Sequence, residues 1–342
     1  MADVVLAIGT SHSPMLNASV QEWGHFQQRE PTTKLRDRQG RPSSYGALLQ
    51  EAAGRYDGQA TPARFAERHG AAQAALDRLA AEIRAARLDA LVVFGDDQKE
   101  LFHEDNLPAL MVYTGEAISH RMRPPKPEWV EWFAQVQSRY YPVDDSWQHP
   151  VDAPLANHLV EALVDADFDP AVCERLPRDE GMGHAFAFVH QRLFGWQRPS
   201  FLPPMPRLEP AIPVVPIFIN TYYPPNQPSP ERCYRLGQTV RAAIGRWPGK
   251  ARVGVLGSGG LSHFAIDEEL DGRIVGALRD RDRNALVTLP REQLNSGNSE
   301  IRNWIAMAGA GEHLPHAWSE YIPAYRTPAG TGTGFCFAVA RH

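Results

Sequence analysis

Two histidines follow short apolar runs in this chain, and histidine is the side chain best suited to proton transfer near neutral pH. His12 comes shortly after the run 4–8, and His263 follows the run 253–256 through a segment of glycines and serines. Glycines at such positions let a ligand or a metal approach the backbone closely. Because a histidine at a strand end can also be a purely structural hydrogen-bonding group, the two residues indicate chemistry only together with other polar residues.

Further polar side chains occupy equivalent places: they are Asp96, Asp97 and Gln98 after the apolar run 90–94, and Glu300 at the start of a predicted helix. Ligands of α/β sheets bind beyond the carboxyl ends of the strands, so these side chains are expected to lie near the two histidines. Imidazole together with carboxylate is the ligand set that non-haem Fe(II) favours, with Zn²⁺ and Mn²⁺ as alternatives that spacing alone does not separate. Asp96 and Asp97 are expected to cap the loop or to orient a ligand.

Short apolar runs alternate with helical patterns along the chain. Strands are predicted at 4–8, 90–94, 109–113, 212–220, 252–256 and 334–340, and helices at 71–87, 128–140, 153–166, 232–247, 267–284 and 299–308. This alternation predicts an α/β fold in which a single large domain, residues 1–342, has a central mixed sheet covered by helices on both faces.

Two regions depart from the simple alternation. Residues 17–72 lack apolar periodicity, and we expect an excursion of short helices and loops there, such as a helix over 45–53, rather than core. Pro213 and Pro216 interrupt the strand 212–220, which places that strand near an edge of the predicted sheet.

Composition excludes several functional classes. The formal net charge of the 342 residues is -5, and no basic patch of the kind that binds nucleic acid occurs. No apolar run reaches the roughly 18–20 residues of a membrane helix, and the N-terminus lacks the pattern of a signal peptide. The three cysteines are widely spaced and fit no disulfide framework or zinc motif, so a reducing cytoplasm is expected. No dinucleotide-binding glycine motif or P-loop is present.

Several separated motifs together resemble the class III extradiol ring-cleavage dioxygenases, the relatives of the protocatechuate 4,5-dioxygenase β subunit. They are the segments 9–14, 181–184, 216–221, 259–263 and 299–304. The resemblance extends from residue 1 to about 340 and is weakest over 17–72. The single-chain form and the segment 95–98 are most similar to the gallate and 3-O-methylgallate dioxygenases.

The resemblance implies roles for individual residues. His12 would be the first iron ligand and Glu300 the carboxylate ligand. His263 would be the catalytic acid and base beside the metal rather than a ligand, and His184 would contact the substrate or support the ligands. The chain has Gln98 where the protocatechuate enzymes have a second histidine ligand, and the amide oxygen of Gln98 could take that place.

Two further residues are candidates for the substrate pocket. His103, five residues after Gln98, could complete the metal site or contact the substrate. Arg326 could bind the carboxylate of an anionic aromatic substrate.

The resemblance implies an Fe(II)-dependent homodimeric enzyme that uses O₂ to open the ring of a catechol-type compound such as gallate, 3-O-methylgallate or protocatechuate. Because Gln98 replaces a ligand histidine, three alternatives stay open: a non-catechol substrate, a zinc hydrolase, or a non-catalytic metal-binding scaffold.

Overall fold

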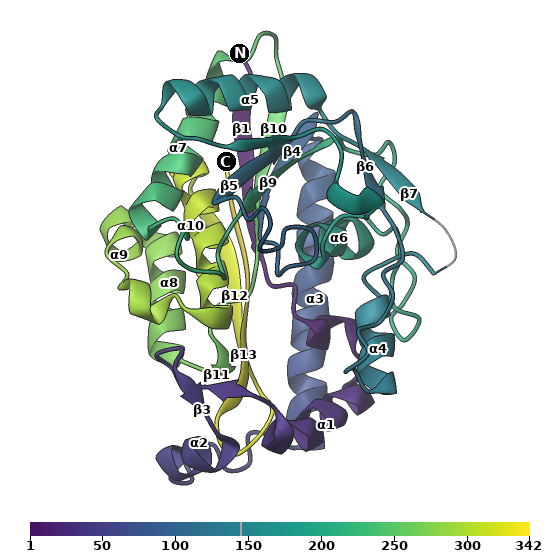
Figure 1. Ribbon diagram of the computed structural model, residues 1–342, viewed down its shortest axis with the longest axis vertical. Helices are drawn as coiled ribbons and strands as arrows, with labels where there is room; N and C mark the ends of the chain where they lie inside the picture. The colour runs from purple at the N-terminus through teal and green to yellow at the C-terminus, as the bar shows by residue number, and fades with distance from the viewer. Residues whose placement is uncertain (144–145) are drawn as a thin grey trace.

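The computed structural model describes residues 1–143 and 146–342, and a mixed β-sheet runs through its centre (Figure 1). The strand order is β11-β13-β1-β10-β4-β9-β5-β8, and β12 pairs with β13 off this path. The strands are β1 (Asp3–Thr10), β4 (Ala90–Gly95), β5 (Leu110–Tyr113), β8 (Ala171–Cys173), β9 (Val214–Ile219), β10 (Arg252–Ser258), β11 (His263–Ala265), β12 (His316–Tyr325) and β13 (Thr331–Arg341). Strands β1, β10, β4 and β9 run parallel, whereas β13 and β5 join this group antiparallel.

Helices cover both faces of the sheet, as the alternation predicts. In Figure 1 the helices α7 (Pro230–Arg246), α8 (Glu268–Asp280), α9 (Arg283–Val287) and α10 (Ile301–Ala310) lie on one side, while α3 (Pro62–Ala86), α4 (Glu131–Ser138) and α6 (His184–Phe188) lie on the other. The remaining helices are α1 (Val20–Arg29), α2 (Tyr45–Ala52) and α5 (Ala153–Asp165), and two small two-stranded sheets are formed by β2 (Leu35–Arg36) with β3 (Pro42–Ser43) and by β6 (Ala117–His120) with β7 (Trp147–Pro150).

The strand β4 shows why both faces must be covered. Leu91 and Val93 belong to one buried apolar cluster, whereas Val92 and Phe94 belong to the other. Successive side chains of a strand point to opposite faces, so a strand that is apolar at every position needs a hydrophobic layer on each side. The predicted fold class, a single domain with a mixed sheet between helical layers, is confirmed.

The expectation that residues 17–72 lie outside the core is wrong for part of that region. Trp23 and Phe26 of α1 are buried at 0% and 5% exposure and pack in the same apolar cluster as Phe65 of α3. The helix α3 also begins nine residues earlier than expected, because Thr61 caps it and Pro62 occupies its first turn.

The prediction for the strand 212–220 is wrong in its position. Strand β9 lies between β4 and β5 and is therefore internal. The sheet accommodates Pro216 because the pairing of β9 with β5 covers only Ile217 to Ile219, so the missing N–H falls beyond that ladder. Strand β12, which pairs with β13 along its length, was not predicted.

Within the described part of the chain, none of the helices combines the length and the apolar character needed to cross a membrane.

Candidate metal centre

The candidate site lies at the carboxyl ends of three neighbouring parallel strands. Thr10 of β1 is level with Ser258 of β10, and Gly257 is level with Phe94 of β4. Because the three strands end together, the residues that follow them meet at one edge of the sheet. Glu300 joins them from the turn that precedes α10, a helix that packs on β10 and β1.

Three side chains form a cluster with the geometry of a metal-binding site. One donor atom from each of His12, Asp96 and Glu300 lies within 4.8 Å of the other two. All three residues are buried, with exposures of 2%, 0% and 2%. The Nε2 atom of His12 and the Oε2 atom of Glu300 are 3.3 Å apart. A cation between these groups would replace the water that burial has removed from them.

Hydrogen bonding determines which nitrogen of His12 is free. The Ser258 hydroxyl donates to the carbonyl oxygen of Ala185 at 2.7 Å, so it accepts a hydrogen bond from Nδ1 of His12 at 3.0 Å. The proton therefore resides on Nδ1, and Nε2 carries a lone pair. Nε2 is buried and forms no hydrogen bond within residues 1–143 and 146–342. A histidine held this way is prepared to bind a metal through Nε2.

The two carboxylates of the cluster also favour the binding of a cation. Burial raises the pKa of Asp96, and the neighbouring Glu300 carboxylate raises it further. Burial alone would also raise the pKa of Glu300, but the protonated forms of His263 and His12, together with the Gly260 N–H, outweigh it and lower that pKa to about 2. The Gly260 N–H donates to Glu300 Oε2 at 2.6 Å. Glu300 is thus an anion beside a second buried acid, an arrangement that a bound cation would stabilise.

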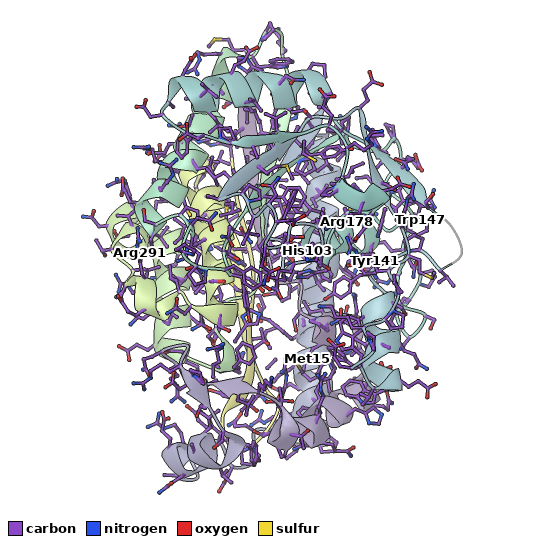
Figure 2. All side chains as sticks on the ribbon, viewed as in Figure 1. Met15, His103, Tyr141, Trp147, Arg178 and Arg291 are labelled. Carbon is purple, nitrogen blue, oxygen red and sulfur yellow. The ribbon has the colours of Figure 1, made fainter. Side chains whose placement is uncertain are left out.

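Gln98 reaches this cluster and His103 does not. The amide nitrogen of Gln98 donates to Asp96 Oδ2 at 3.2 Å and to Glu300 Oε1 at 2.9 Å. His103, which is labelled near the centre of Figure 2, instead lines a neighbouring cavity. Asp97 accepts hydrogen bonds from the N–H groups of residues 101 and 102 at 2.9 and 3.1 Å, and so caps the loop as expected.

Asp96 is the cluster member that sequence reasoning assigned to a supporting role. The only signal for it was its place as the first polar residue after β4. Its carboxylate is positioned by Asn303 of α10, whose amide donates to Asp96 Oδ1 at 3.3 Å and to the Ser258 carbonyl oxygen at 2.7 Å. Asn303 was not singled out from the sequence, because nothing local to it indicates a contact across 207 residues.

His263 lies next to the cluster and is oriented for proton transfer. Its Nδ1–H donates to the carbonyl oxygen of Leu261 at 2.8 Å, which leaves the lone pair on Nε2. Nε2 is 3.6 Å from Glu300 Oε2, and the side chain is 18% exposed. The backbone N–H of His263 donates to Asn298 Oδ1 at 2.7 Å. The ring therefore presents a basic nitrogen at the boundary between the buried cluster and the open cavity.

Two glycines allow the His263 ring to occupy this place. A Cβ atom at Gly260 would lie 2.3 Å from Cε1 of His263, and one at Gly297 would lie 2.2 Å from its Cβ. Neither distance is compatible with a real side chain, so both positions require glycine for packing rather than for a special backbone angle.

Replacing Gly297 with alanine is expected to displace His263 and to lower the free energy of unfolding by about 1–3 kcal/mol, the usual cost of overpacking. Urea unfolding measures the change. Gly272→Ala in α8 is the matched control, because a Cβ there meets no atom within 4 Å. Equal stability of the Gly297→Ala and Gly272→Ala variants would contradict the proposed packing.

His184 forms a partly buried ion pair beside the cluster, in which the two side chains are 14% and 15% exposed. Its Nδ1 lies 2.7 Å from Glu100 Oε2, and its ring packs edge-on against His12 with centroids 4.6 Å apart. Burial would lower the pKa of His184, but the charge of Glu100 outweighs it and raises the pKa to about 9. Burial would likewise raise the pKa of Glu100, and His184 outweighs it and lowers that pKa to about 2. His184 is therefore a cation at neutral pH.

The pair stabilises the fold over a defined pH range. The contribution of His184 is fully present below pH 6.5, its ordinary pKa, and is lost as pH rises towards about 9. The contribution of Glu100 is present above pH 4.5 and is lost as pH falls towards about 2.

Replacing Glu100 with glutamine is expected to lower the pKa of His184, because burial is then opposed only by the charges of Asp96 and Glu300. Imidazole NMR signals of the metal-free protein, followed from pH 5 to pH 10, measure this as a fall of the His184 pKa from about 9. Glu104→Gln in the same loop is the control, since Glu104 is exposed and pairs with Lys99. An unchanged His184 pKa in Glu100→Gln would refute the ion pair.

The cluster opens into a cavity of about 230 Å³, which we call the site cavity. Its walls include His12, Gln98, Glu100, Lys126, Trp129, Gln137, His184, Tyr222, His263, Glu300 and Arg326. Arg326 belongs to this wall, and its role as a substrate contact stays a prediction. Its guanidinium already pairs with Glu30 at 2.9 Å. Glu30 is 3% exposed. This ion pair reduces the net positive charge that Arg326 can offer to a ligand.

A family model and several curated relatives match this chain. The family model described as "Catalytic LigB subunit of aromatic ring-opening dioxygenase" matches residues 6–336. The chain is 35% identical over 125 residues to a 2,3-dihydroxyphenylpropionate/2,3-dihydroxicinnamic acid 1,2-dioxygenase of Cupriavidus necator, which covers 36% of this chain and 33% of that protein. It is 27% identical over 190 residues to the gallate dioxygenase of Pseudomonas putida, covering 50% of each.

A third relative, a 2,3-dihydroxyphenylpropionate/2,3-dihydroxicinnamic acid 1,2-dioxygenase 1 of Dechloromonas aromatica, is 27% identical over 210 residues, which cover 59% of this chain and 54% of that protein. The chain thus spans between a third and just over half the length of these curated relatives. The family model covers almost the whole chain and includes every member of the cluster. The chain therefore belongs to the family of the catalytic LigB subunit of aromatic ring-opening dioxygenases.

Proposed function

We propose that this protein is a non-haem Fe(II)-dependent extradiol dioxygenase that uses O₂ to open the ring of a catechol-type aromatic compound. The observation that carries the proposal is the buried cluster of His12, Asp96 and Glu300, with a free Nε2 on His12 and a basic histidine, His263, beside it. Membership of the ring-opening dioxygenase family and the named activities of its relatives support the same reaction.

The residues present fit a divalent metal. His12 would supply an imidazole nitrogen, Glu300 a carboxylate oxygen, and Asp96 or the amide oxygen of Gln98 a third donor. This donor set has one imidazole and is richer in oxygen than the two-histidine, one-carboxylate set usual for such iron, so it is a harder site. When bound there, Fe(II) would supply the affinity for O₂ and would lower the pKa values of the substrate hydroxyls.

The protein's own histidines would handle the protons. His263 would accept a hydroxyl proton of the substrate at Nε2 and return it later in the reaction, since its Nδ1 is committed to Leu261. His184, held as a cation by Glu100, would stabilise negative charge that develops in the site cavity. Both histidines line that cavity.

Metal analysis combined with oxygen uptake tests this function. The protein is purified without oxygen, loaded with Fe(II) and offered gallate, 3-O-methylgallate and protocatechuate. Iron bound in a one-to-one ratio and oxygen consumed with each ring opened are expected. Zinc retained through purification, with no oxygen uptake after exchange to Fe(II), would contradict the proposal and favour a hydrolase. Iron bound without oxygen uptake would favour a non-catalytic metal-binding scaffold, and absence of any bound metal would contradict the proposal.

We also propose that the protein acts in the cytoplasm, as a homodimer. All three cysteines are free and two of them, Cys233 and Cys336, are buried, which fits a reducing compartment. Light scattering after size-exclusion chromatography tests the dimer.

A further inference from the structure

The residue before His263 is held in place through every polar group that it carries. Ser262 is fully buried, its N–H donates to Asp271 Oδ1 at 2.8 Å, and its hydroxyl donates to Asp271 Oδ2 at 2.6 Å. The hydroxyl oxygen accepts from the Asp267 N–H at 3.0 Å, and the Ser262 carbonyl oxygen accepts from the Gly334 N–H at 2.8 Å. Helix α8 and strand β13 therefore fix this residue from two sides.

Asp271 is a buried acid that takes no direct part in the proposed reaction. It lies in the first turn of α8, is 0% exposed, and accepts a third hydrogen bond from the Tyr321 hydroxyl of β12 at 2.7 Å. Strand β13 leaves room for it because residue 334 is glycine, since a Cβ atom there would lie 2.1 Å from Asp271 Oδ2.

Stability alone does not account for this acid. Burial raises the pKa of Asp271 from 3.8 to about 7, although the hydrogen bonds from Ser262 and Tyr321 lower it. An acid whose pKa is raised by folding makes the protein less stable as pH rises from its ordinary pKa towards the raised one. A buried carboxylate that is kept in spite of this cost is a candidate for a functional role.

A single peptide group joins Asp271 to the ring of His263. The N–H of Ser262, which Asp271 binds, belongs to the same planar peptide as the carbonyl oxygen of Leu261. That oxygen accepts the Nδ1–H of His263 at 2.8 Å. Because the peptide is planar, fixing the direction of its N–H also fixes the direction of its C=O. The carboxylate also polarises the peptide, which strengthens the hydrogen bond to the imidazole.

The backbone on the other side of His263 has an unfavourable conformation. Phe264 has a φ of 65°, in the left-handed region that residues other than glycine rarely adopt. Such residues persist only where the surrounding structure determines their conformation, and they gather at functional sites. The pairing of His263 with Thr333 and of Phe264 with Gly332 supplies that constraint. The segments on both sides of His263 are thus held in a fixed shape.

We propose that Asp271 is a positioning residue for His263. Through the peptide between Leu261 and Ser262 it directs the carbonyl oxygen that holds Nδ1–H, and so keeps the unprotonated Nε2 available to the site cavity. In a Ser-His-Asp triad a buried carboxylate orients the histidine directly, whereas here one peptide group stands between the two. The effect on catalysis rests on the proposed function, but the orientation of the ring does not.

Replacing Asp271 with asparagine tests the proposal, because an amide offers one acceptor oxygen where three donors converge. In nitrogen NMR spectra of the metal-free protein at pH 9, the parent should show His263 with its proton on Nδ1 alone, and Asp271→Asn should show both tautomers in exchange. With Fe(II) and a catechol, kcat should fall by about 10–100-fold while KM changes by less than about twofold, because a misplaced catalytic group acts mainly on the chemical step.

Two further variants separate this role from a general effect on packing. Tyr321→Phe removes one donor from the same carboxylate and leaves the hydrogen bond from the Ser262 N–H in place, so His263 should keep its single tautomer. Glu269→Gln is the matched control, an exposed acid in the same turn of α8, and should keep both the tautomer and kcat. Equal loss of the tautomer in Tyr321→Phe and Asp271→Asn would overturn the proposal in favour of a packing role.

A measurement on the unmodified protein decides the matter if Asp271→Asn does not fold. The amide proton of Ser262 should shift with pH at the same midpoint as the carboxyl carbon of Asp271, near pH 7, because the two groups are hydrogen-bonded. A Ser262 amide that does not respond there, or an unchanged His263 tautomer in folded Asp271→Asn, would overturn the proposal. Failure of the proposed function would appear separately, as missing oxygen uptake in the parent, and would leave the NMR results unaffected.

Discussion

Replacing Glu300 with glutamine is expected to weaken metal binding by at least about 100-fold and to reduce ring opening in proportion. Loss of groups that merely support ligands already costs about 10–100-fold in affinity, so removal of a ligand charge should exceed that range. Glutamine preserves the size of the side chain and one oxygen that can still accept from Gly260. The charge is the main change.

The same substitution removes the response of stability to metal. Neutralising Glu300 relieves its repulsion with the buried acid Asp96, but it also removes the interactions with His263, His12 and the Gly260 N–H that lower the pKa of Glu300 to about 2, so the two effects on the metal-free protein oppose each other. We therefore expect Glu300→Gln to lose the gain in melting temperature that Fe(II) gives the parent. Metal titration followed by thermal unfolding measures this loss.

Glu292→Gln is the matched control for Glu300→Gln, because Glu292 is an exposed acid in the preceding turn. It should keep the parent's metal content and activity. Full metal content in Glu300→Gln would remove Glu300 from the metal site and would leave Asp96 and Gln98 as the acceptors to test.

Replacing His263 with alanine is expected to lower the rate of ring opening by about 10²–10⁴-fold without changing metal content. A positioned acid or base contributes about that factor to catalysis. His263 Nε2 lies beside Glu300 and is accessible from the site cavity, whereas its Nδ1 is bound by Leu261. Loss of the ring removes proton transfer and leaves the buried cluster intact.

Three measurements distinguish this role from a structural one. Iron content should match the parent, the rate should lose one ionisation from its pH profile, and added imidazole should restore part of the rate. His25→Gln, at an exposed position of α1, is the control. Iron lost from His263→Ala to the same degree as from Glu300→Gln would instead identify His263 as a ligand.

Much of the site's location follows from local patterns. The apolar runs of β1, β4 and β10 predict strands because a strand covered on both faces is apolar at nearly every position. Parallel strands of one sheet end at the same edge, so the polar residues that follow them must gather there. His12 and the segment 96–98 were brought near one another on that argument alone, and the structure places them together.

Local patterns did not predict which of the residues at this edge of the sheet form the metal cluster. Asp96 rather than His103 joins His12 and Glu300, because Asn303 of α10 holds the Asp96 carboxylate and the loop capped by Asp97 carries His103 away. Likewise the partner of Arg326 is Glu30, from a region that was expected to lie outside the core. The contacts of Asn303 with Asp96 and of Arg326 with Glu30 join residues far apart in the chain, whereas the cap formed by Asp97 is local.

The fold class, the edge of the sheet at which the site lies and the residue types available there could be predicted from the sequence, since they depend on periodicity and on strand direction. The folded structure was needed to show which nitrogen of His12 is free, which carboxylates meet it, that His184 is paired with Glu100, and that a second cavity adjoins the site. The physical reason is that hydrogen bonds and burial act over a few ångströms in space. Their partners here come from elements separated by tens to hundreds of residues, whose juxtaposition is set by packing of the whole domain.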